Sequence, residues 1–150
     1  MQENELRTEI LIDAPPSAVW AVLTDFGRYR EWNDLIEYVS GRAEEGAEVR
    51  TRAAWGSPAE REFEGRITAV EPPSLLASEG GDPELFFGRH RWELSAEGAG
   101  TRLVNREVWT GPLAESVYAQ SKELLTDEFD AFNKALKTEA ERLNGARSAL

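Results

Sequence analysis

The hydrophobic positions of the chain follow a period of two at the start and a helical period soon after. Residues 5–13 alternate between apolar and polar side chains, which predicts a first β-strand. Pro15 and Pro16 end that strand and begin a helix, because proline is tolerated in the first turn of a helix. Apolar residues then follow helical spacing over 16–26. We expect a short helix there and a second short helix or turn before residue 37.

The middle of the chain returns to a period of two, interrupted by glycine and proline. This pattern predicts six further strands. Their expected ranges are 37–43, 47–55, 61–70, 74–78, 86–96 and 101–110. The segment Glu79-Gly80-Gly81-Asp82-Pro83 is typical of a flexible loop. With Leu85 and the Gly111-Pro112 turn, this loop is expected to flank one open end of the sheet.

The last segment has the clearest helical pattern, from Pro112 to Asn144. Apolar side chains follow one face of the expected helix, and charged side chains take the opposite face. The apolar residues are Leu113, Val117, Leu124, Leu125, Phe129, Phe132, Leu136 and Leu143. About 30 helical residues span about 45 Å, which is enough to cross a whole small sheet. We expect Gly145 to end the helix, and residues 1–4 and 145–150 to be frayed.

Composition narrows the class of protein. A chain of 150 residues with 41% hydrophobic and 30% charged residues is expected to form one domain over 1–150. The net charge of −11 is a poor match for a nucleic-acid partner or an anionic membrane surface. No apolar run approaches the ~20 residues that span a membrane, and the acidic start is unlike a signal peptide. We expect a cytoplasmic protein, which the absence of cysteine also fits.

The motifs of several chemistries are missing from the sequence. One histidine and no cysteine give no support for a metal site. The patterns Gly-x-Ser-x-Gly and Gly-x-Gly-x-x-Gly and a phosphate loop are all absent. We therefore expect no serine triad, no metal and no cofactor.

The last two predicted strands give the sharpest inference about chemistry. If Gly98-Ala99 forms a two-residue hairpin loop, the register places His90 opposite Glu107. One face then carries His90, Trp92, Leu94, Leu103, Asn105, Glu107 and Trp109, and the other carries Arg89, Arg91, Glu93, Arg102 and Arg106. The arginine-rich face is expected to be exposed to solvent. The single histidine is therefore expected on the inner face, with its Cβ ~5 Å from the Cβ of a glutamate.

A titratable pair on an apolar face needs a reason, because burying a charge without a partner is costly. Three interpretations stay open. One is a structural pair, whose members satisfy each other or reach water at a cavity mouth. A second is a polar anchor that orients a carbonyl, hydroxyl or carboxylate group of a ligand. A third is general acid–base catalysis, in which Glu107 assists His90 in proton transfer.

Four segments of the chain carry a resemblance to a known family. They are Ile12-Asp13-Ala14-Pro15-Pro16-Ser17-Ala18-Val19-Trp20, Tyr29-Arg30-Glu31-Trp32-Asn33, Leu85-Phe86-Phe87-Gly88-Arg89-His90-Arg91-Trp92-Glu93-Leu94 and Gly100-Thr101-Arg102-Leu103-Val104-Asn105-Arg106-Glu107. With the last helix, they resemble the START-like superfamily, also called SRPBCC or Bet v 1-like, in its polyketide cyclase/dehydrase branch. The resemblance implies an α+β helix-grip fold. In that fold a curved seven-stranded antiparallel sheet wraps around a long C-terminal helix, with two short helices after the first strand.

The resemblance also implies a cavity, which the predicted inner faces would line. We expect the chain to bind a small hydrophobic or aromatic molecule, lipid- or polyketide-like, between the sheet and the last helix. The expected ligand-binding residues are Phe63, Ile67, Phe87, His90, Trp92, Asn105, Glu107, Trp109, Leu125, Phe129 and Phe132. Trp55 is expected on an inward face as well. The chain is expected to be a monomer or a homodimer.

Two other functions stay open. One is an enzyme of the polyketide cyclase, aromatase or dehydratase type, in which the candidate catalytic residues His90 and Glu107 move protons. The other is a protein-interaction module whose cavity is collapsed and whose acidic surface meets a protein partner. Saturable one-to-one binding, turnover that is lost in His90→Ala, and a co-purifying protein are the observations that separate the three functions.

Overall fold

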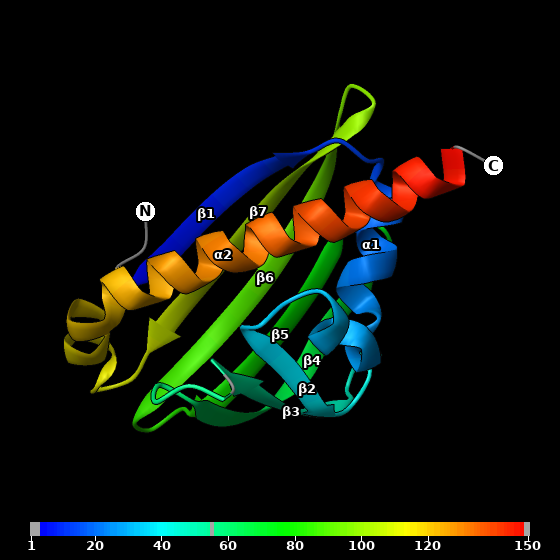
Figure 1. The fold of residues 1–150 in the computed structure, drawn as a ribbon. Helices are drawn as coiled ribbons and strands as arrows, with labels where there is room; N and C mark the ends of the chain where they lie inside the picture. Colours follow the sequence, from blue (N-terminus) through cyan, green and yellow to red (C-terminus); the bar gives the residue numbers. More distant parts are fainter. Residues whose placement is uncertain (1–3, 55, 149–150) are drawn as a thin grey trace.

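The computed structural model describes residues 4–54 and 56–148. One curved sheet and one long helix form two layers (Figure 1). The elements in chain order are β1 (Glu5–Ile12), α1 (Pro16–Thr24), the 3-10 helix η1 (Phe26–Glu31), β2 (Ile36–Ser40), β3 (Glu48–Ala53), β4 (Arg61–Glu71), β5 (Leu75–Asp82), β6 (Phe86–Glu97), β7 (Gly100–Thr110) and α2 (Ala114–Ser148). This arrangement confirms the α+β helix-grip fold expected from the sequence.

The sheet is antiparallel throughout, with the strand order β1-β7-β6-β5-β4-β3-β2. From β2 to β7, each strand pairs with its neighbour in sequence, while β1 pairs with β7 at the opposite edge. The sheet curls around α2, and the short helices lie near the C-terminal part of α2 (Figure 1).

The hairpin between β6 and β7 has the predicted register. Gly98-Ala99 forms the two-residue loop that joins the strands. Because the loop fixes the register, His90 pairs with Glu107. Trp92 pairs with Asn105 in the same way.

The strands β2 and β3 are shorter than the predicted 37–43 and 47–55, whereas β5 is longer than the sequence pattern predicts. The prediction ends this strand at Ser78 and assigns a loop to 79–83, but β5 continues through Asp82. Gly80 pairs there with Gly88 on β6. The glycines that favour a loop in the sequence therefore form a close contact between strands, which is a common role for glycine inside a sheet.

The last helix also extends past its predicted end. The prediction places the stop at Gly145, but α2 continues through this residue to Ser148. Glycine inside a helix costs only about 1 kcal/mol relative to alanine, which the helix-forming neighbours offset. Residues 1–3 and 149–150, where fraying is expected, lie outside the described part of the chain.

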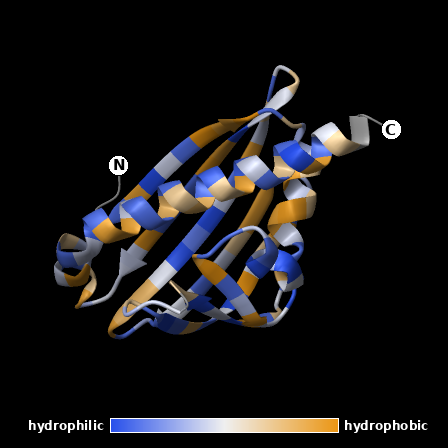
Figure 2. Ribbon diagram, in the orientation of Figure 1, coloured by the Kyte–Doolittle hydropathy of each residue, from blue (hydrophilic) through white to orange (hydrophobic). Residues whose placement is uncertain are grey.

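Apolar side chains fill one end of the space between the sheet and the helices, which we call the closed end. Leu23 of α1, Leu103 of β7 and Leu136 of α2 are completely buried there. The core cluster of the closed end includes Val19, Leu23, Ile67, Leu76, Leu94, Leu103, Phe132, Leu136 and Ala140. Hydrophobic and hydrophilic positions alternate along the strands and around α2 (Figure 2), so each element offers one apolar side to this core.

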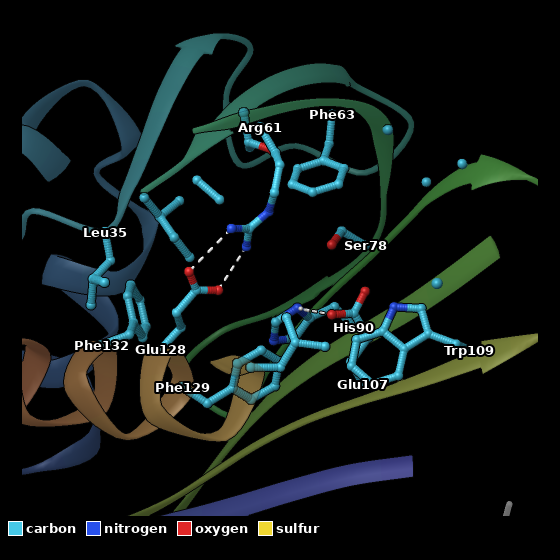
Figure 3. Close-up of a pocket in the computed structure, with 18 of the residues that line it drawn as sticks. Leu35, Arg61, Phe63, Ser78, His90, Glu107, Trp109, Glu128, Phe129 and Phe132 are labelled. Carbon is cyan, nitrogen blue, oxygen red and sulfur yellow. Dashed lines mark hydrogen bonds and ion pairs between the residues drawn. The ribbon is translucent and has the colours of Figure 1, made fainter. Parts of the chain in front are cut away.

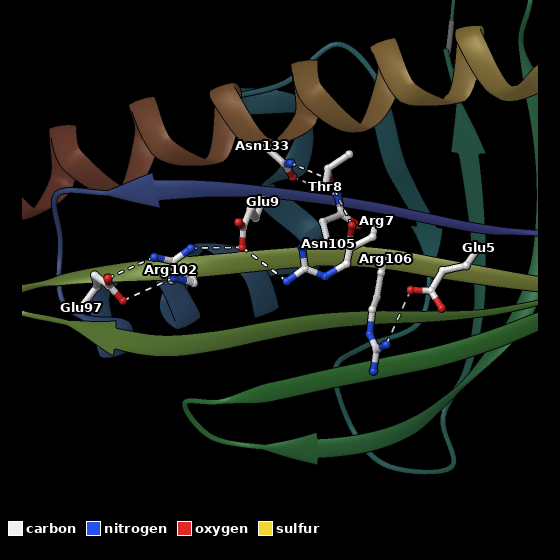
Figure 4. A network of polar contacts seen from close by, with 9 residues as sticks. All are labelled: Glu5, Arg7, Thr8, Glu9, Glu97, Arg102, Asn105, Arg106 and Asn133. Carbon is white, nitrogen blue, oxygen red and sulfur yellow. Dashed lines mark hydrogen bonds and ion pairs between the residues drawn. The ribbon is translucent and has the colours of Figure 1, made fainter. Parts of the chain in front are cut away.

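The outer face of the sheet is charged. Arg102 Nη1 on β7 lies 3.2 Å from Glu9 Oε2, and its Nη2 lies 3.0 Å from Glu97 Oε1 (Figure 4). Arg106 Nη1 lies 3.8 Å from Glu5 Oε1. Such surface pairs typically contribute about 0.2–1 kcal/mol each. The stability of the fold therefore comes mainly from buried apolar packing, of which the closed end holds the larger cluster.

Candidate functional site

A cavity of about 410 Å³ lies at the opposite end, between the sheet and the first half of α2. We call this the open end. Side chains from β2 to β7 and from α2 line the cavity (Figure 3). Its volume falls within the range of small-molecule sites, which is about 300–1,000 Å³.

One row of the sheet under the cavity carries no side chains, and we call it the glycine row. Gly65 of β4 pairs with Gly80 of β5, which pairs with Gly88 of β6. All three residues line the cavity. A Cβ on Gly65 would lie 2.4 Å from the carbonyl oxygen of Glu79, and a Cβ on Gly80 would lie 2.6 Å from that of Glu64. The strands thus approach more closely than side chains allow, and the row leaves a hollow in the sheet.

The adjacent row of the sheet carries polar groups that face the cavity. Ser78 on β5 pairs with His90 on β6, which pairs with Glu107 on β7. The Nδ1 atom of His90 lies 3.3 Å from Glu107 Oε1, and the two side chains are 13% and 20% exposed. The pair expected from the register is therefore present, largely buried and directed toward the cavity (Figure 3).

The imidazole of His90 is engaged on both faces and at both nitrogens. Its ring stacks on Trp92 with centroids 3.7 Å apart, and on Phe129 of α2 with centroids 5.1 Å apart. Its Nε2 lies 2.6 Å from Asn105 Oδ1. Because Nδ1 contacts Glu107, neither ring nitrogen is left for a ligand. His90 is therefore a positioning residue for the Glu107 carboxylate.

Buried polar side chains fix the direction of the hydrogen bond at His90. Thr8 Oγ1 donates to the main-chain carbonyl of Asn105 at 3.0 Å, and Asn133 Nδ2 donates to Thr8 Oγ1 at 2.9 Å (Figure 4). Asn105 Nδ2 donates to Asn133 Oδ1 at 2.9 Å. The remaining oxygen, Asn105 Oδ1, must then accept from His90 Nε2. We call Thr8, Asn105 and Asn133 the asparagine network.

A second charged pair spans the open end from the sheet to the helix. Arg61 of β4 donates to Glu128 of α2 through both terminal nitrogens, at 2.7 Å from Nη2 to Oε1 and 3.3 Å from Nη1 to Oε2 (Figure 3). Among the described residues that line the cavity, Arg61 is the only lysine or arginine. Its guanidinium is therefore already occupied by a carboxylate.

Two tyrosines keep one side of the cavity uncharged. Burial raises the pKa of Tyr29 and also that of Tyr38. The Tyr29 hydroxyl donates to the carbonyl of Leu23, and the Tyr38 ring stacks on Phe26 with centroids 3.7 Å apart. This wall is therefore aromatic and neutral at physiological pH.

Nine of the eleven residues expected in the lining border the cavity. They are Phe63, His90, Trp92, Asn105, Glu107, Trp109, Leu125, Phe129 and Phe132. The structure brings these side chains together from β4, β6, β7 and α2. Their contact with a ligand stays a prediction.

The other two expected residues lie elsewhere. Ile67 is completely buried in the core of the closed end and does not border the cavity. Phe87 lies on the outer face, where the guanidinium carbon of Arg89 is 5.0 Å from its ring centroid. Successive residues of a strand face opposite sides, so Phe87 must point outward when Gly88 points inward. Trp55 lies outside the described residues.

The polar residues of this region that the sequence did not predict as site residues include Arg61, Ser78, Glu128 and Asn133. Asn133 carried a usable signal, since it stands beside Phe132 in the apolar pattern of the last helix. The other three carried none. Charged and hydroxyl side chains are ordinary at strand ends and on helix surfaces, and their meeting depends on how α2 sits on the sheet.

A family model matches nearly the whole chain. The model described as polyketide cyclase / dehydrase and lipid transport covers residues 4–141. The chain therefore belongs to the polyketide cyclase/dehydrase and lipid transport family, in agreement with the resemblance in its sequence. A search of curated proteins finds no match.

Solved structures share the fold at low sequence identity. DynU16, from the dynemicin biosynthetic locus, is 19% identical with a TM-score of 0.73; the match covers 93% of this chain and 48% of DynU16, so this chain spans about half of that protein. Ms6760 from Mycobacterium smegmatis is 14% identical with a TM-score of 0.74, and the match covers 89% and 88% of the two chains. CalU16 from Micromonospora echinospora is 24% identical with a TM-score of 0.59, and the match covers 95% and 86%. These likenesses show the fold alone.

The described part of the chain contains neither a membrane-spanning helix nor a cluster of metal ligands. No helix within residues 4–54 and 56–148 is long and apolar enough to cross a membrane. Over the same residues, no group of three or more His, Cys, Asp or Glu side chains is arranged to hold a metal ion.

Proposed function

We propose that the chain binds a small hydrophobic or aromatic molecule in the open-end cavity. The observation that carries this proposal is a cavity of about 410 Å³ with mainly apolar walls. Open apolar surface lacks the packing contacts that a ligand of matching shape supplies. Membership of a family described by polyketide chemistry and lipid transport supports the same class of ligand.

The aromatic lining favours a flat ligand. Phe63 of β4, Trp109 of β7 and Phe129 of α2 border the cavity from three sides of the open end (Figure 3). Phe63 remains 49% exposed, so a ligand that covers its ring removes apolar surface from water. Aromatic faces stack favourably on other aromatic rings. A fused aromatic ring system is therefore a suitable probe of the cavity.

Native mass spectrometry of the freshly purified chain tests this proposal directly. We expect a one-to-one adduct that disappears when the protein is denatured. A chain without adduct is then titrated with pyrene, a fused aromatic hydrocarbon, and we expect saturable binding at one site. If the protein shows no adduct and also no saturable binding of pyrene, the proposal is overturned.

A pair of tryptophan substitutions shows whether binding occurs in this cavity. Ser121 lines the cavity on α2, and Ser121→Trp places an indole in the space of the ligand. Ala119 is exposed on the same helix and does not line the cavity, so Ala119→Trp is the matched control. We expect pyrene binding to be lost in Ser121→Trp and kept in Ala119→Trp. Equal effects of the two substitutions place the ligand elsewhere.

The contact between His90 Nδ1 and Glu107 Oε1 supports a second candidate, a proton-transfer enzyme of the cyclase, aromatase or dehydratase type. Because both nitrogens of His90 are engaged, Glu107 would be the catalytic residue in such an enzyme. Deuterium exchange at the acidic carbon of 2-tetralone, an aromatic ketone, tests this candidate by NMR. If the chain accelerates the exchange and Glu107→Gln abolishes the acceleration, this candidate is supported. If exchange proceeds at the rate in solvent, only the binding function remains.

The third function considered from the sequence assumes a collapsed cavity. The open end has instead a volume of about 410 Å³. This observation favours the binding function over a protein-interaction module of that kind.

A further inference from the structure

We infer that the cavity selects a ligand that carries a hydroxyl group, recognised jointly by Glu107 and Trp109, and that it discriminates against carboxylates. This inference rests on the proposed binding function and names the polar group of the ligand. It narrows the earlier expectation of an anchor for a carbonyl, hydroxyl or carboxylate.

Glu107 presents one of its two carboxylate oxygens to the cavity. His90 Nδ1 engages Oε1, whereas no described residue donates a hydrogen bond to Oε2. Figure 3 shows one oxygen directed at His90 and the other directed away from it, beside the indole of Trp109. A Cβ on Gly88 would lie 2.4 Å from Oε2. This oxygen therefore lies over the glycine row, in space that no side chain of the row fills.

Glu107 Oε2 can accept a hydrogen bond whether the proton shared with His90 is on the imidazole or on the carboxyl group. His90 Nε2 carries a hydrogen, because it donates to Asn105 Oδ1. Nδ1 lies 3.3 Å from Oε1, so a hydrogen shared by the two groups is bound either to the imidazole or to this carboxyl oxygen. Both arrangements place the hydrogen between Nδ1 and Oε1. Both therefore leave the lone pairs of Oε2 available to a ligand.

Trp109 adds a hydrogen-bond donor next to that acceptor. A Cβ on Gly88 would also lie 3.1 Å from Trp109 Nε1, so the indole N–H and Glu107 Oε2 border the same space. No described residue accepts a hydrogen bond from this N–H. A hydroxyl group matches such a pair, because its single oxygen both donates and accepts. A carboxylate only accepts and therefore opposes Oε2.

The cavity also lacks a free cation for an anionic ligand. Arg61 is the single lysine or arginine among the described lining residues, and Glu128 already binds it with two hydrogen bonds. A carboxylate entering the cavity would have to displace Glu128 or lose its hydration without a partner. Both outcomes are unfavourable.

Three probes with one ring system test the inference at pH 7 on the full chain. Pyrene has no polar group, 1-hydroxypyrene has a hydroxyl, and pyrene-1-carboxylate has a charged group at the same carbon. Fluorescence titration measures the dissociation constant of each. We expect 1-hydroxypyrene to bind about tenfold more tightly than pyrene, the gain typical of a hydrogen bond to a charged group. We expect the carboxylate to bind more weakly than pyrene.

Substitutions at the two recognising residues locate the preference. Glu107→Met keeps the length of the side chain and removes the acceptor, so 1-hydroxypyrene should bind no better than pyrene. Glu107→Gln keeps an acceptor oxygen while its amide donates to His90, so the hydroxyl preference should persist. Trp109→Phe keeps an aromatic ring and removes the N–H, which should weaken 1-hydroxypyrene and leave pyrene unchanged. Glu93→Met is the control, because Glu93 is a carboxylate on the outer face of β6 that pairs with Arg91.

Each outcome bears on one of the two proposals. Equal binding of pyrene and 1-hydroxypyrene, or tightest binding of the carboxylate, overturns the hydroxyl inference and leaves the binding function standing. A loss of preference in Glu93→Met as large as in Glu107→Met also overturns it. Failure of all three probes to bind counts against the binding function itself. If thermal denaturation shows that Glu107→Met is unfolded, Trp109→Phe decides the inference.

Discussion

The closed and open ends are covered by the same helix but differ in what the sheet presents to it. At the closed end, Leu76 and Leu103 of the sheet meet Leu136 of α2, and all three are completely buried. At the open end, the glycine row presents no side chains, and Leu124 of α2 remains 47% exposed although it borders the cavity. The cavity therefore results from side chains missing in the sheet. The helix runs through both ends without interruption.

This division separates stability from binding along a single helix. The C-terminal half of α2 packs into the larger core cluster, while its N-terminal half borders the cavity and packs into a smaller cluster that includes Trp109 and Phe129. The asparagine network joins α2 to the sheet between the two halves, because Asn133 stands between Phe132, which borders the cavity, and Leu136, which is buried at the closed end. Substitutions at the two ends should therefore have different consequences for unfolding and for ligand affinity.

The largest difference is expected from one substitution made at each end of α2. Leu136→Ala should lower the free energy of unfolding by about 2–5 kcal/mol, because it opens a void in a filled core. Leu124→Ala should change it by less than about 0.5 kcal/mol, because this side chain is half exposed. Urea denaturation followed by circular dichroism measures both. Similar losses at the two positions contradict the division between the ends.

A smaller effect is expected at the boundary. Asn133→Leu should lower the free energy of unfolding by about 1–3 kcal/mol, because Asn105 Nδ2 loses its buried acceptor. It should also change the ¹⁵N chemical shifts of the His90 ring, which Asn105 orients. Lys134→Leu, at the exposed neighbouring position, is the control. Unchanged histidine signals in Asn133→Leu mean that the network does not hold the ring.

The smallest effect on stability is expected at the charged pair of the open end. Arg61→Met should change the free energy of unfolding by less than about 1 kcal/mol, as partly exposed ion pairs do. It should nevertheless speed the dissociation of 1-hydroxypyrene, because Arg61 and Glu128 link the sheet to the helix across the cavity. Stopped-flow fluorescence measures this rate. Arg50→Met, which removes exposed pairs between β3 and β4, should leave this rate unchanged. Equal rates in both variants would exclude a role for the link.

Much of the fold could be predicted because local rules determine it. The two-residue loop at Gly98-Ala99 leaves only one register for β6 and β7, so the meeting of His90 and Glu107 follows from the sequence alone. The same alternation, applied consistently, excludes Phe87 from the lining once His90 is placed inward. Phe87 is apolar, but its position in the strand places it on the outer face beside Arg89.

The remainder of the site depends on contacts between distant segments. Nothing local relates Arg61 to Glu128, because their meeting requires the angle at which α2 crosses the sheet. The extension of β5 through Gly80 likewise depends on a neighbouring glycine in β6. Glycine in a sequence indicates a turn more often than a close approach of strands. The role of Gly80 inside a strand can therefore be recognised only from its pairing with Gly88.

The glycine row restricts how the cavity can change by mutation. Any larger residue at Gly65 or Gly80 would press against main-chain oxygens at 2.4 and 2.6 Å, and those oxygens cannot move without the strands. The helix side of the cavity, with Ser121 and the half-exposed Leu124, has no comparable restraint. New ligand specificities, in related proteins or in a laboratory library, should therefore arise from substitutions in α2, while the glycine row of the sheet stays the same.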